Sequence, residues 1–342
     1  NEMRPPLALT VGEPAGIGPD IALAAWVRRA ELDLPPFYLL ADPAFLARRA
    51  HALGLDLSVA AVTPAQANRA FPTAMPVVDI GSAITAQPGV PDASSAPAAI
   101  TAIDRAVAAV LAGEAAAIVT NPIAKSVLYR AGFGDPGHTE YLARLATRAT
   151  GRAVLPVMML WSPELAVVPV TIHVPLAAVP GQLTRDRIVA TGRIVARDLA
   201  WRFRIGRPRL VIAGLNPHAS ENGAIGHEEH DIIAPAVAAL AAEGIAVRGP
   251  LPADTLFHAG MRATYDAALC MYHDQALIPI KTLAFAHAVN VTLGLPFVRT
   301  SPDHGTAFDL AGTGRADPSS LVAALRLAMR LADAHPAIAA AE

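Results

Sequence analysis

Short apolar runs rich in β-branched residues alternate along this chain with longer segments in which apolar positions recur at helical spacing. Runs of the first kind predict buried strands, and segments of the second kind predict amphipathic helices. Their alternation is typical of βα units around a mainly parallel sheet, so it indicates an α/β fold. Strands are expected at residues 7–11, 37–41, 116–120, 156–161, 166–172, 210–215, 267–272 and 289–295, and helices at residues 19–30, 43–53, 98–112, 139–149, 184–203, 230–243 and 319–334.

Three histidines stand just behind predicted strands. His173, His218 and His273 follow the apolar runs AVVPVTI, LVIAGL and AALCMY. In open parallel α/β sheets, ligands bind beyond the carboxyl ends of the strands, and three neutral imidazoles with an open position are typical of a catalytic metal site. Separations of 45 and 55 residues are not a local ligand motif, so each histidine alone also fits a hydrogen-bonded structural role. Their shared position favours one metal site.

Two segments place polar residues at predicted helix starts. The backbone amides of GEPAGIG, residues 12–18, are suited either to binding an anion or to forming a tight strand-to-helix turn. In GHTEYLA, residues 137–143, Thr139 is a candidate helix cap, and the amides beside it favour a phosphate. Capping alone explains Thr139 but leaves His138 unexplained.

Lys281, Asn290 and Arg299 recur at nine-residue intervals after His273. Two cations and an amide fit a ligand that carries a phosphate and a carboxylate. Solvated surface charges explain the same pattern equally well, so both readings stay open at this point.

Composition narrows the class of protein. The 342 residues are 53% hydrophobic and 16% charged, which is enough apolar material for two packed domains. A net charge of -2, with both signs spread along the chain, predicts neither a nucleic-acid-binding protein nor one that binds anionic membranes. Cys270 is the only cysteine, so a disulfide framework is excluded and a reducing cytoplasm is expected. No apolar run approaches the ~20 residues of a membrane helix.

Seven sequence blocks together resemble the 4-hydroxythreonine-4-phosphate dehydrogenase family of pyridoxal phosphate biosynthesis. They run in order from about residue 7 to residue 325: VGEPAGIGPD, GHTEYLA, TIHVPL, LNPHASENGAIGHEE, GPLPADTLF, YHDQALIPIK and VNVTLGLPFVRTSPDHGTAFDLAGTG. In addition, HGTAFDLAGTGRADP, residues 304–318, is similar to the cofactor loop HGSAPDIAGKGIANP of isopropylmalate and isocitrate dehydrogenases. Those enzymes bind nicotinamide cofactors without the G-x-G-x-x-G fingerprint, which this chain also lacks after its first strand.

The resemblance implies a fold of two α/β/α domains with a cleft between them, like that of isocitrate and isopropylmalate dehydrogenases and unlike a Rossmann fold. Residues 1–125 and 265–342 would form the first domain. Residues 126–264 would form the second domain and carry the dimer contacts.

The resemblance also implies a reaction. NAD or NADP would oxidise 4-phosphohydroxy-L-threonine to 2-amino-3-oxo-4-phosphooxybutanoate, which decarboxylates to 3-amino-2-oxopropyl phosphate in pyridoxine 5'-phosphate biosynthesis. Each subunit would hold one divalent ion (Zn, Mg or Co), and the enzyme would be a homodimer with active sites at its interface and metal ligands drawn from both subunits.

The residues that match the family's functional positions follow from the same blocks. His173, His218 and His273 would hold the metal, the same three histidines that their strand-end positions select. Gly305 and Thr306, with His304, would contact the cofactor. The implied substrate contacts are His138, Thr139, Lys281, Asn290 and Arg299, and the candidate catalytic groups are Asp254, Asp274 and Lys281.

Three alternatives stay open. A sister dehydrogenase would act on a phosphorylated four-carbon sugar acid or on a cis-dihydrodiol, since one changed polar contact would suffice. A metal-dependent phosphate hydrolase would use the same histidines to activate water, and a non-catalytic anion-binding protein would need no metal. The cofactor-loop similarity at residues 304–318 argues against the last two.

Overall fold

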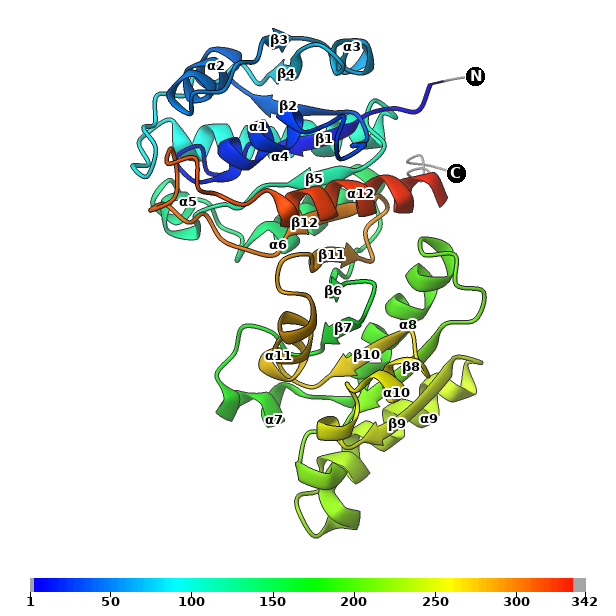
Figure 1. The fold of residues 1–342 in the computed structure, drawn as a ribbon. Helices are drawn as coiled ribbons and strands as arrows, with labels where there is room; N and C mark the ends of the chain where they lie inside the picture. The colour runs from blue at the N-terminus through cyan, green and yellow to red at the C-terminus, as the bar shows by residue number, and fades with distance from the viewer. Residues whose placement is uncertain (1–2, 335–342) are drawn as a thin grey trace. The chain divides into compact units, whose positions relative to one another are not determined.

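The computed structural model describes residues 3–334, and the chain divides by its internal contacts into two compact units. Unit 1 comprises residues 3–156 and 295–334, and unit 2 comprises residues 157–294. In Figure 1, unit 1 runs from blue to green and returns in orange and red, whereas unit 2 runs from green to gold.

These boundaries differ from the expected ones at 125/126 and 264/265. Residues 126–156 belong to unit 1 because helix α6 (His138–Thr150) packs against α4 (Ser95–Leu111) of that unit. Residues 265–294 belong to unit 2 because strand β10 (Ala267–Cys270) pairs with two strands of that unit's sheet.

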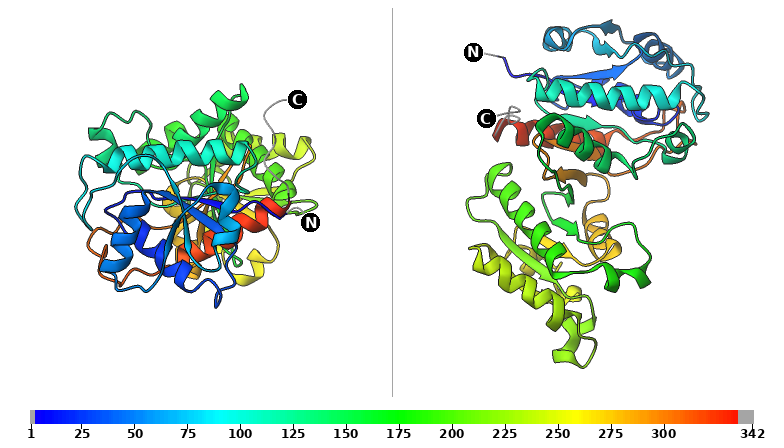
Figure 2. Two further views of the ribbon diagram at one scale, coloured as in Figure 1. Left: turned by 90° about the horizontal axis from the view of Figure 1, so that it is seen from above. Right: turned by 180° about the vertical axis from the view of Figure 1, so that it is seen from behind.

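Unit 1 is built on a parallel sheet with the strand order β3-β4-β2-β1-β5-β12. Helices α4 and α6 cover one face of this sheet, and α1 and α12 cover the other (Figures 1 and 2). Strands enclosed on both faces read as continuous apolar runs, as LALT and FYLLA do here. The strands are β1 (Leu7–Thr10), β2 (Phe37–Ala41), β3 (Val59–Ala61), β4 (Met75–Asp79), β5 (Ile118–Thr120) and β12 (Arg299–Pro302), and the other helices are α1 (Gly18–Val27), α2 (Pro43–Ala52), α3 (Pro64–Ala70), α5 (Lys125–Arg130) and α12 (Ser319–Ala334).

Unit 2 has a mixed sheet with the order β11-β6-β7-β10-β8-β9. Strands β7, β10, β8 and β9 run parallel to one another, whereas β6 is antiparallel to both β7 and β11. The strands are β6 (Val157–Trp161), β7 (Ala166–Pro169), β8 (Arg209–Ala213), β9 (Ala246–Leu251) and β11 (Val289–Leu293), and the helices are η1 (Leu176–Ala178), α7 (Val179–Gln182), α8 (Arg185–Trp201), η2 (Pro217–Gly223), η3 (Glu229–Ile233), α9 (Ala234–Ala242), η4 (Ala253–Thr255), α10 (Ala259–Arg262) and α11 (His273–Ala284).

Local sequence signals place several helix ends. Asp42 precedes α2, its carboxylate accepts a hydrogen bond from the Ala44 amide at 3.1 Å, and Pro43 stands at the first helical position. Thr184 caps α8 in the same way, with its hydroxyl accepting from the Arg187 amide. Gly151 ends α6 in the left-handed conformation, with φ of +69°, which glycine adopts without steric cost.

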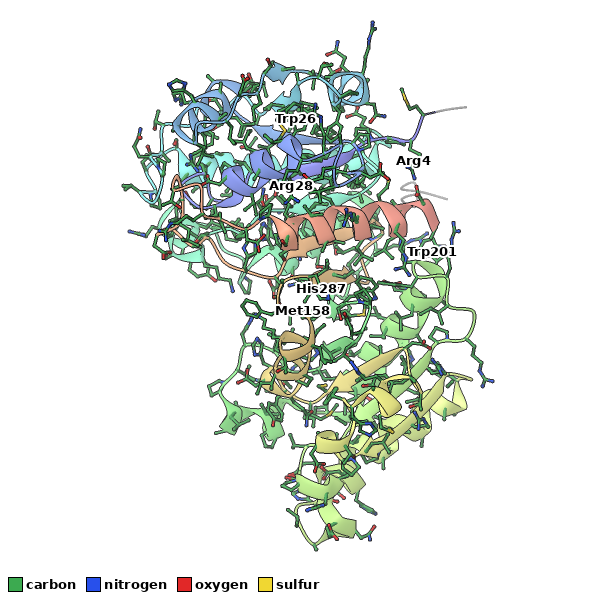
Figure 3. The ribbon with its side chains drawn as sticks, in the orientation of Figure 1. Arg4, Trp26, Arg28, Met158, Trp201 and His287 are labelled. Atoms are coloured by element: carbon green, nitrogen blue, oxygen red, sulfur yellow. The ribbon has the colours of Figure 1, made fainter. Side chains whose placement is uncertain are left out.

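Side chains from helices and strands fill the interior of each unit (Figure 3). In unit 1, Trp26 is 4% exposed, and its indole Nε1 donates a hydrogen bond to the Phe71 carbonyl at 3.0 Å. In unit 2, Leu160, Val167 and Val211 from three strands pack with Ile280 of α11. Within the described part of the chain, every helix falls short of the length and apolar character that a membrane span needs.

The predicted α/β fold class is confirmed, and a strand overlaps each of the predicted strand ranges. The elements that were not predicted are strands β3, β4, β9 and β12, helices α3, α5, α7, α10 and α11, and the short helices η1, η2 and η4. Helix α11 contains Pro279, a residue that normally interrupts helical hydrogen bonding, so its sequence does not read as a helix. This helix begins at His273, which makes its omission relevant to the site.

Candidate functional site

The three strand-end histidines of unit 2 follow neighbouring parallel strands. His173, His273 and His218 come shortly after β7, β10 and β8, and β10 lies between the other two in the sheet. Parallel strands end at the same edge of a sheet, where α/β proteins bind their ligands. The chain therefore brings the three histidine-bearing segments to one edge of unit 2.

His173 and His273 lie side by side at this edge. Their ring centroids are 5.5 Å apart, with an angle of 44° between the ring planes. Both line one pocket of about 350 Å³, together with Asp274 and the apolar side chains of Ile172 and Leu176. Two imidazoles in one pocket are a fitting pair of ligands for a divalent metal.

Contacts within unit 2 orient His273. Its Nδ1 lies 2.7 Å from Asp274 Oδ1, so Nδ1 carries the proton and the lone pair of Nε2 is the one suited to a metal. The side chain of Gln275 binds two backbone segments. Its Oε1 accepts a hydrogen bond from the Met271 amide at 2.7 Å, and its Nε2 donates one to the Gly214 carbonyl at 2.9 Å. Gln275 thus ties the end of β10 to the end of β8, a function that the sequence analysis missed.

His218 does not join this pair. Its side chain is 66% exposed, and its Nδ1 lies 3.7 Å from Glu221 Oε2. Among residues 3–334, no group of three or more histidine, cysteine or acidic side chains is arranged to hold a metal ion. A single chain therefore supplies a pair of neighbouring imidazoles, and the third predicted ligand points elsewhere.

The segment that carries His218 has an unusual backbone. Residues 218–222 all have left-handed conformations, with φ between +47° and +72°, at a cost of about 1–2 kcal/mol for each non-glycine residue. The buried carboxylate of Glu229 anchors the segment's start, because it accepts from the Asn216 amide at 2.6 Å and from the Asn216 side chain at 3.0 Å. Strained backbone that its surroundings hold in place is typical of functional segments.

The remaining unit 2 residues predicted from the sequence occupy varied environments. Asn290 lies on β11, and its Oδ1 is buried without a hydrogen-bond partner. Lys281 lies in the last turn of α11 and is half-buried. Asp254 is exposed on η4, which contacts η2, so it lies near the His218 segment.

Unit 1 contains a separate cluster of cationic and polar side chains. Arg299 begins β12, is 3% exposed, and donates to the Thr120 hydroxyl through Nε at 3.1 Å and Nη2 at 2.7 Å. His138 is the first residue of α6, followed by Thr139, and its Nε2 is buried without a hydrogen-bond partner. Burial lowers the pKa of Arg299 to about 10. A buried imidazole nitrogen without a hydrogen-bond partner, beside a buried cation, suits an anionic ligand.

Lys125 belongs to this cluster and was missed by the sequence analysis. Burial lowers the pKa of His138 well below its usual value, and the charges of Arg299 and Lys125 lower it further. Lys125 begins α5, a few residues after the end of β5. Like the strand-end histidines, Lys125 follows an apolar run, AAIVT, so its position after a predicted strand is the signal that marks it.

Because His138 is neutral in the folded chain, it contributes to the pH dependence of stability. The unfolded chain binds a proton at the ordinary histidine pKa of about 6.5, so the free energy of unfolding falls as pH drops below that value towards the folded pKa. We expect the free energy of unfolding of the His138→Gln protein to fall less between pH 7 and pH 5 than that of the wild type. The difference between the two slopes should be up to about 1.4 kcal/mol for each pH unit. Urea unfolding at several pH values measures this slope, and equal slopes for both proteins would contradict the assignment.

The predicted cofactor residues lie in a loop that unit 1 holds firmly. The Ile17 amide donates to the Thr306 carbonyl at 2.9 Å, and the Gly312 amide donates to Asp20 Oδ2 at 2.6 Å. Gly305 is exposed, and His304 Nε2 is buried without a hydrogen-bond partner. A Cβ atom on Gly16 would approach the Thr306 carbonyl to 3.0 Å, so the two segments pack closely.

The segment 12–18 is a packed turn and not an open anion-binding loop. The Glu13 amide donates to the Pro122 carbonyl at 2.8 Å, and the Ala15 amide donates to the Glu13 carboxylate at 3.1 Å. With the Ile17 amide also engaged, these donors are already satisfied. Of the two readings of GEPAGIG, the tight turn is therefore correct, and its amides serve the packing of the cofactor-loop region.

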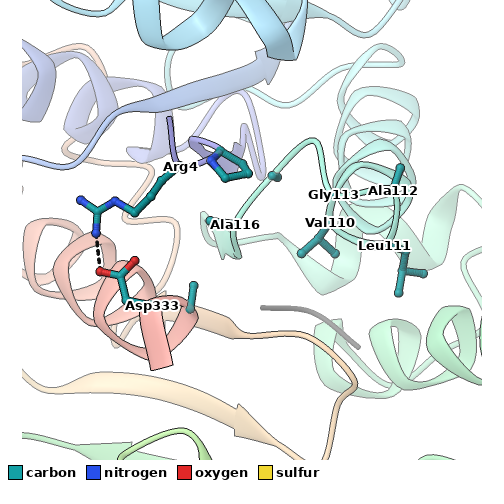
Figure 4. Close-up of a pocket in the computed structure, with 10 residues that line it drawn as sticks. Arg4, Val110, Leu111, Ala112, Gly113, Ala116 and Asp333 are labelled. Atoms are coloured by element: carbon teal, nitrogen blue, oxygen red, sulfur yellow. Dashed lines mark hydrogen bonds and ion pairs between the residues drawn. The ribbon is translucent and has the colours of Figure 1, made fainter. Parts of the chain in front are cut away.

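A cavity of about 500 Å³ lies at the opposite edge of the unit 1 sheet (Figure 4). It is lined by Arg4 and Pro5, which precede β1, and by Ala115 and Ala116, which precede β5. Its lining is mostly apolar, and an exposed ion pair between Arg4 and Asp333 lies at its rim. This cavity faces the amino ends of the strands, so it is remote from the cationic cluster of unit 1 that contains His138 and Arg299.

Nearly the whole chain is similar to known proteins. The family described as "Pyridoxal phosphate biosynthetic protein PdxA" matches residues 33–328. A 4-hydroxythreonine-4-phosphate dehydrogenase of Bradyrhizobium diazoefficiens is 64% identical over 342 residues, which cover 98% of this chain and 99% of the relative. The crystal structure of the Klebsiella pneumoniae 4-hydroxythreonine-4-phosphate dehydrogenase is similar with a TM-score of 0.85 and 38% identity, covering 96% of this chain and 99% of that one. A terephthalate 1,2-cis-dihydrodiol dehydrogenase of Burkholderia xenovorans is 28% identical with a TM-score of 0.63, covering 96% and 98%.

Proposed function

Because the chain belongs to the PdxA family of pyridoxal phosphate biosynthetic proteins, we propose that it oxidises 4-phosphohydroxy-L-threonine with NAD or NADP. The family predicted from the sequence blocks is thereby confirmed, and the chain is an oxidoreductase of that family. The proposed product, 2-amino-3-oxo-4-phosphooxybutanoate, is a β-keto acid that loses carbon dioxide to form 3-amino-2-oxopropyl phosphate. The observation that carries the proposal is the pair of imidazoles, His173 and His273, 5.5 Å apart in one pocket.

These two histidines would hold a divalent metal, with His218 of the partner subunit as the third ligand. The fit rests on the donor set, because His273 donates a hydrogen bond from Nδ1 to Asp274 and leaves the lone pair of Nε2 for a metal. When bound, a divalent ion supplies Lewis-acid chemistry at the hydroxyl that becomes a ketone. The exposed, strained segment 218–222 is suited to reaching a neighbouring subunit.

The other predicted residues divide by chemistry. His138, Thr139 and Arg299 in unit 1 would bind the substrate phosphate, because a buried guanidinium and an unpartnered imidazole nitrogen favour an anion. In unit 2, Lys281 and the unsatisfied amide oxygen of Asn290 would bind the carboxylate and the ammonium group, respectively.

Asp274 would orient His273, since its Oδ1 already contacts that ring. Asp254 and Lys281 would be the other candidate catalytic groups, beside Asp274. Gly305 and Thr306, with His304, would contact the cofactor in the loop that Asp20 anchors.

Exposed apolar side chains on unit 2 support the proposal of a homodimer. Ile278 is 64% exposed and Phe285 is 78% exposed, on and just after the helix that begins at His273. Leu176, which lines the histidine pocket, is 68% exposed. Apolar residues clustered beside a site are typical of a protein interface.

Replacing Ile278 by aspartate is expected to convert the dimer to monomer and to abolish turnover, because a charge would be buried at the interface. Val27→Asp is the matched control, since Val27 is also exposed, at 42%, but lies in unit 1. Sedimentation analysis gives the oligomeric state of both variants. A dimeric, active Ile278→Asp protein would rule out this face as the interface.

The proposed reaction is tested by turnover on 4-phosphohydroxy-L-threonine with each nicotinamide cofactor, before and after dialysis against a chelator. We expect nicotinamide reduction that chelation removes and metal restores. A phosphorylated four-carbon sugar acid and a cis-dihydrodiol serve as comparison substrates, because a sister dehydrogenase would prefer one of them. Release of inorganic phosphate without nicotinamide reduction would identify a hydrolase and overturn the proposal.

A further inference from the structure

Lysine is rare in this chain. Only two of its 27 basic residues are lysines, Lys125 and Lys281, and the others are arginines. Lysine differs from arginine in presenting a compact point charge on a flexible stem. Lys281 is already among the predicted substrate contacts, whereas Lys125 has no assigned function.

Lys125 lies over the start of helix α6. A Cβ atom placed on Gly137 would lie 3.3 Å from Lys125 Cε, 3.4 Å from Glu140 Oε2 and 3.6 Å from Lys125 Nζ, so the absence of a side chain there makes room for the ammonium group and for the Glu140 carboxylate. Gly137 is the residue that precedes α6, and no side chain caps this helix start. The first amides of the helix and the ammonium group therefore face the same space.

The charges around this point are unbalanced. Lys125 and Arg299 both lie close enough to His138 to disfavour its protonation. Glu140, in the first turn of α6, is the acidic group that interacts with Arg299, so two cations face one carboxylate. The buried Nε2 of His138 lies among them without a hydrogen-bond partner. Buried polar groups left unsatisfied beside excess positive charge indicate a ligand with several negatively charged oxygens.

We propose that Lys125 binds the phosphate group of the substrate, together with His138 and Arg299, at the N-terminus of α6. The inference rests on the proposed function for the identity of the substrate, but phosphate binding itself can be measured without turnover. The ammonium group supplies a mobile point charge, whereas Arg299 is held in place by the Thr120 hydroxyl.

Reductive methylation of the full-length protein tests this directly, because mass spectrometry distinguishes the two lysines. We expect inorganic phosphate to slow methylation of Lys125 about 10-fold or more and to leave the rate at Lys281 unchanged. Equal rates at Lys125 with and without phosphate would overturn the proposal, as would protection confined to Lys281. Protection of Lys125 in a protein that does not turn over 4-phosphohydroxy-L-threonine would retain the phosphate site and reject the proposed substrate.

A variant gives a second measurement. Lys125→Met is expected to weaken inorganic phosphate binding in calorimetry by about 10- to 100-fold and to raise KM for the phosphorylated substrate more than it lowers kcat. Lys125→Arg should restore part of the affinity. Arg130→Met, in the last turn of the same helix, is the matched control and should change neither quantity. Phosphate affinity unchanged in a folded Lys125→Met protein would contradict the assignment.

Discussion

Replacing His273 by alanine is expected to lower metal affinity by more than about 100-fold and to abolish turnover, without unfolding the protein. Loss of a residue that merely orients a metal ligand already costs about 10- to 100-fold, so loss of a ligand should cost more. The side chain lies at the sheet edge, beside His173, and not in the apolar core. The fold should therefore survive its removal.

Metal content after dialysis, and competition with a chromophoric chelator, measure the affinity independently of turnover. His287→Ala is the matched control. His287 lies just after the end of α11, and its exposed side chain contacts Glu164, with Nε2 3.1 Å from Oε2. We expect that control to keep its metal and its activity. A His273→Ala protein with normal metal content would show that the ion, if any, is bound elsewhere.

Replacing Asp20 by alanine is expected to lower the free energy of unfolding by about 3–5 kcal/mol. Asp20 forms an ion pair with Arg49, and the exposed fractions of the two side chains are 4% and 2%. Without Asp20, the buried guanidinium would lack its counter-charge, although Arg49 Nη2 would still donate to the Pro14 carbonyl at 2.7 Å. The loss is a large part of the roughly 5–15 kcal/mol that folded domains possess.

The same substitution should raise KM for the nicotinamide cofactor, because Asp20 Oδ2 accepts the hydrogen bond from the Gly312 amide in the cofactor loop. Denaturant unfolding measures the first effect, and steady-state kinetics with varied cofactor measure the second. The exposed pair between Arg4 and Asp333 provides the control, since Asp333→Ala should cost no more than about 1 kcal/mol. Equal stabilities of the Asp20→Ala and Asp333→Ala proteins would contradict this reasoning.

The sequence predicted the parts of the fold whose signals are local. Buried strands such as FYLLA are continuous apolar runs, and polar residues placed just after them showed where the sheet edge lies. Strand β12 was missed because its residues, RTSP, are mostly polar, and strand β3 because two of its three residues are alanine, which is not enriched in strands. Helix α11 was missed because Pro279 interrupts its pattern.

The arrangement of the site depended on contacts between distant residues. The strand order β7-β10-β8 makes His173 and His273 neighbours, and nothing local to either histidine encodes that order. Asp20 and Arg49 are far apart in the sequence and meet only through the packing of their helices. The left-handed backbone of residues 218–222 depends on the buried Glu229, and no sequence pattern predicts such a segment.

The central claim is that His173 and His273 of one subunit and His218 of the partner subunit bind one metal ion. Mixing two inactive variants, His218→Ala and His273→Ala, under conditions that exchange subunits tests it most directly. In each mixed dimer, one site would have all three histidines, so random exchange should restore about a quarter of wild-type activity. If all three ligands came from the same chain, no mixed dimer would contain an intact site, and activity that stayed absent after verified exchange would contradict the claim.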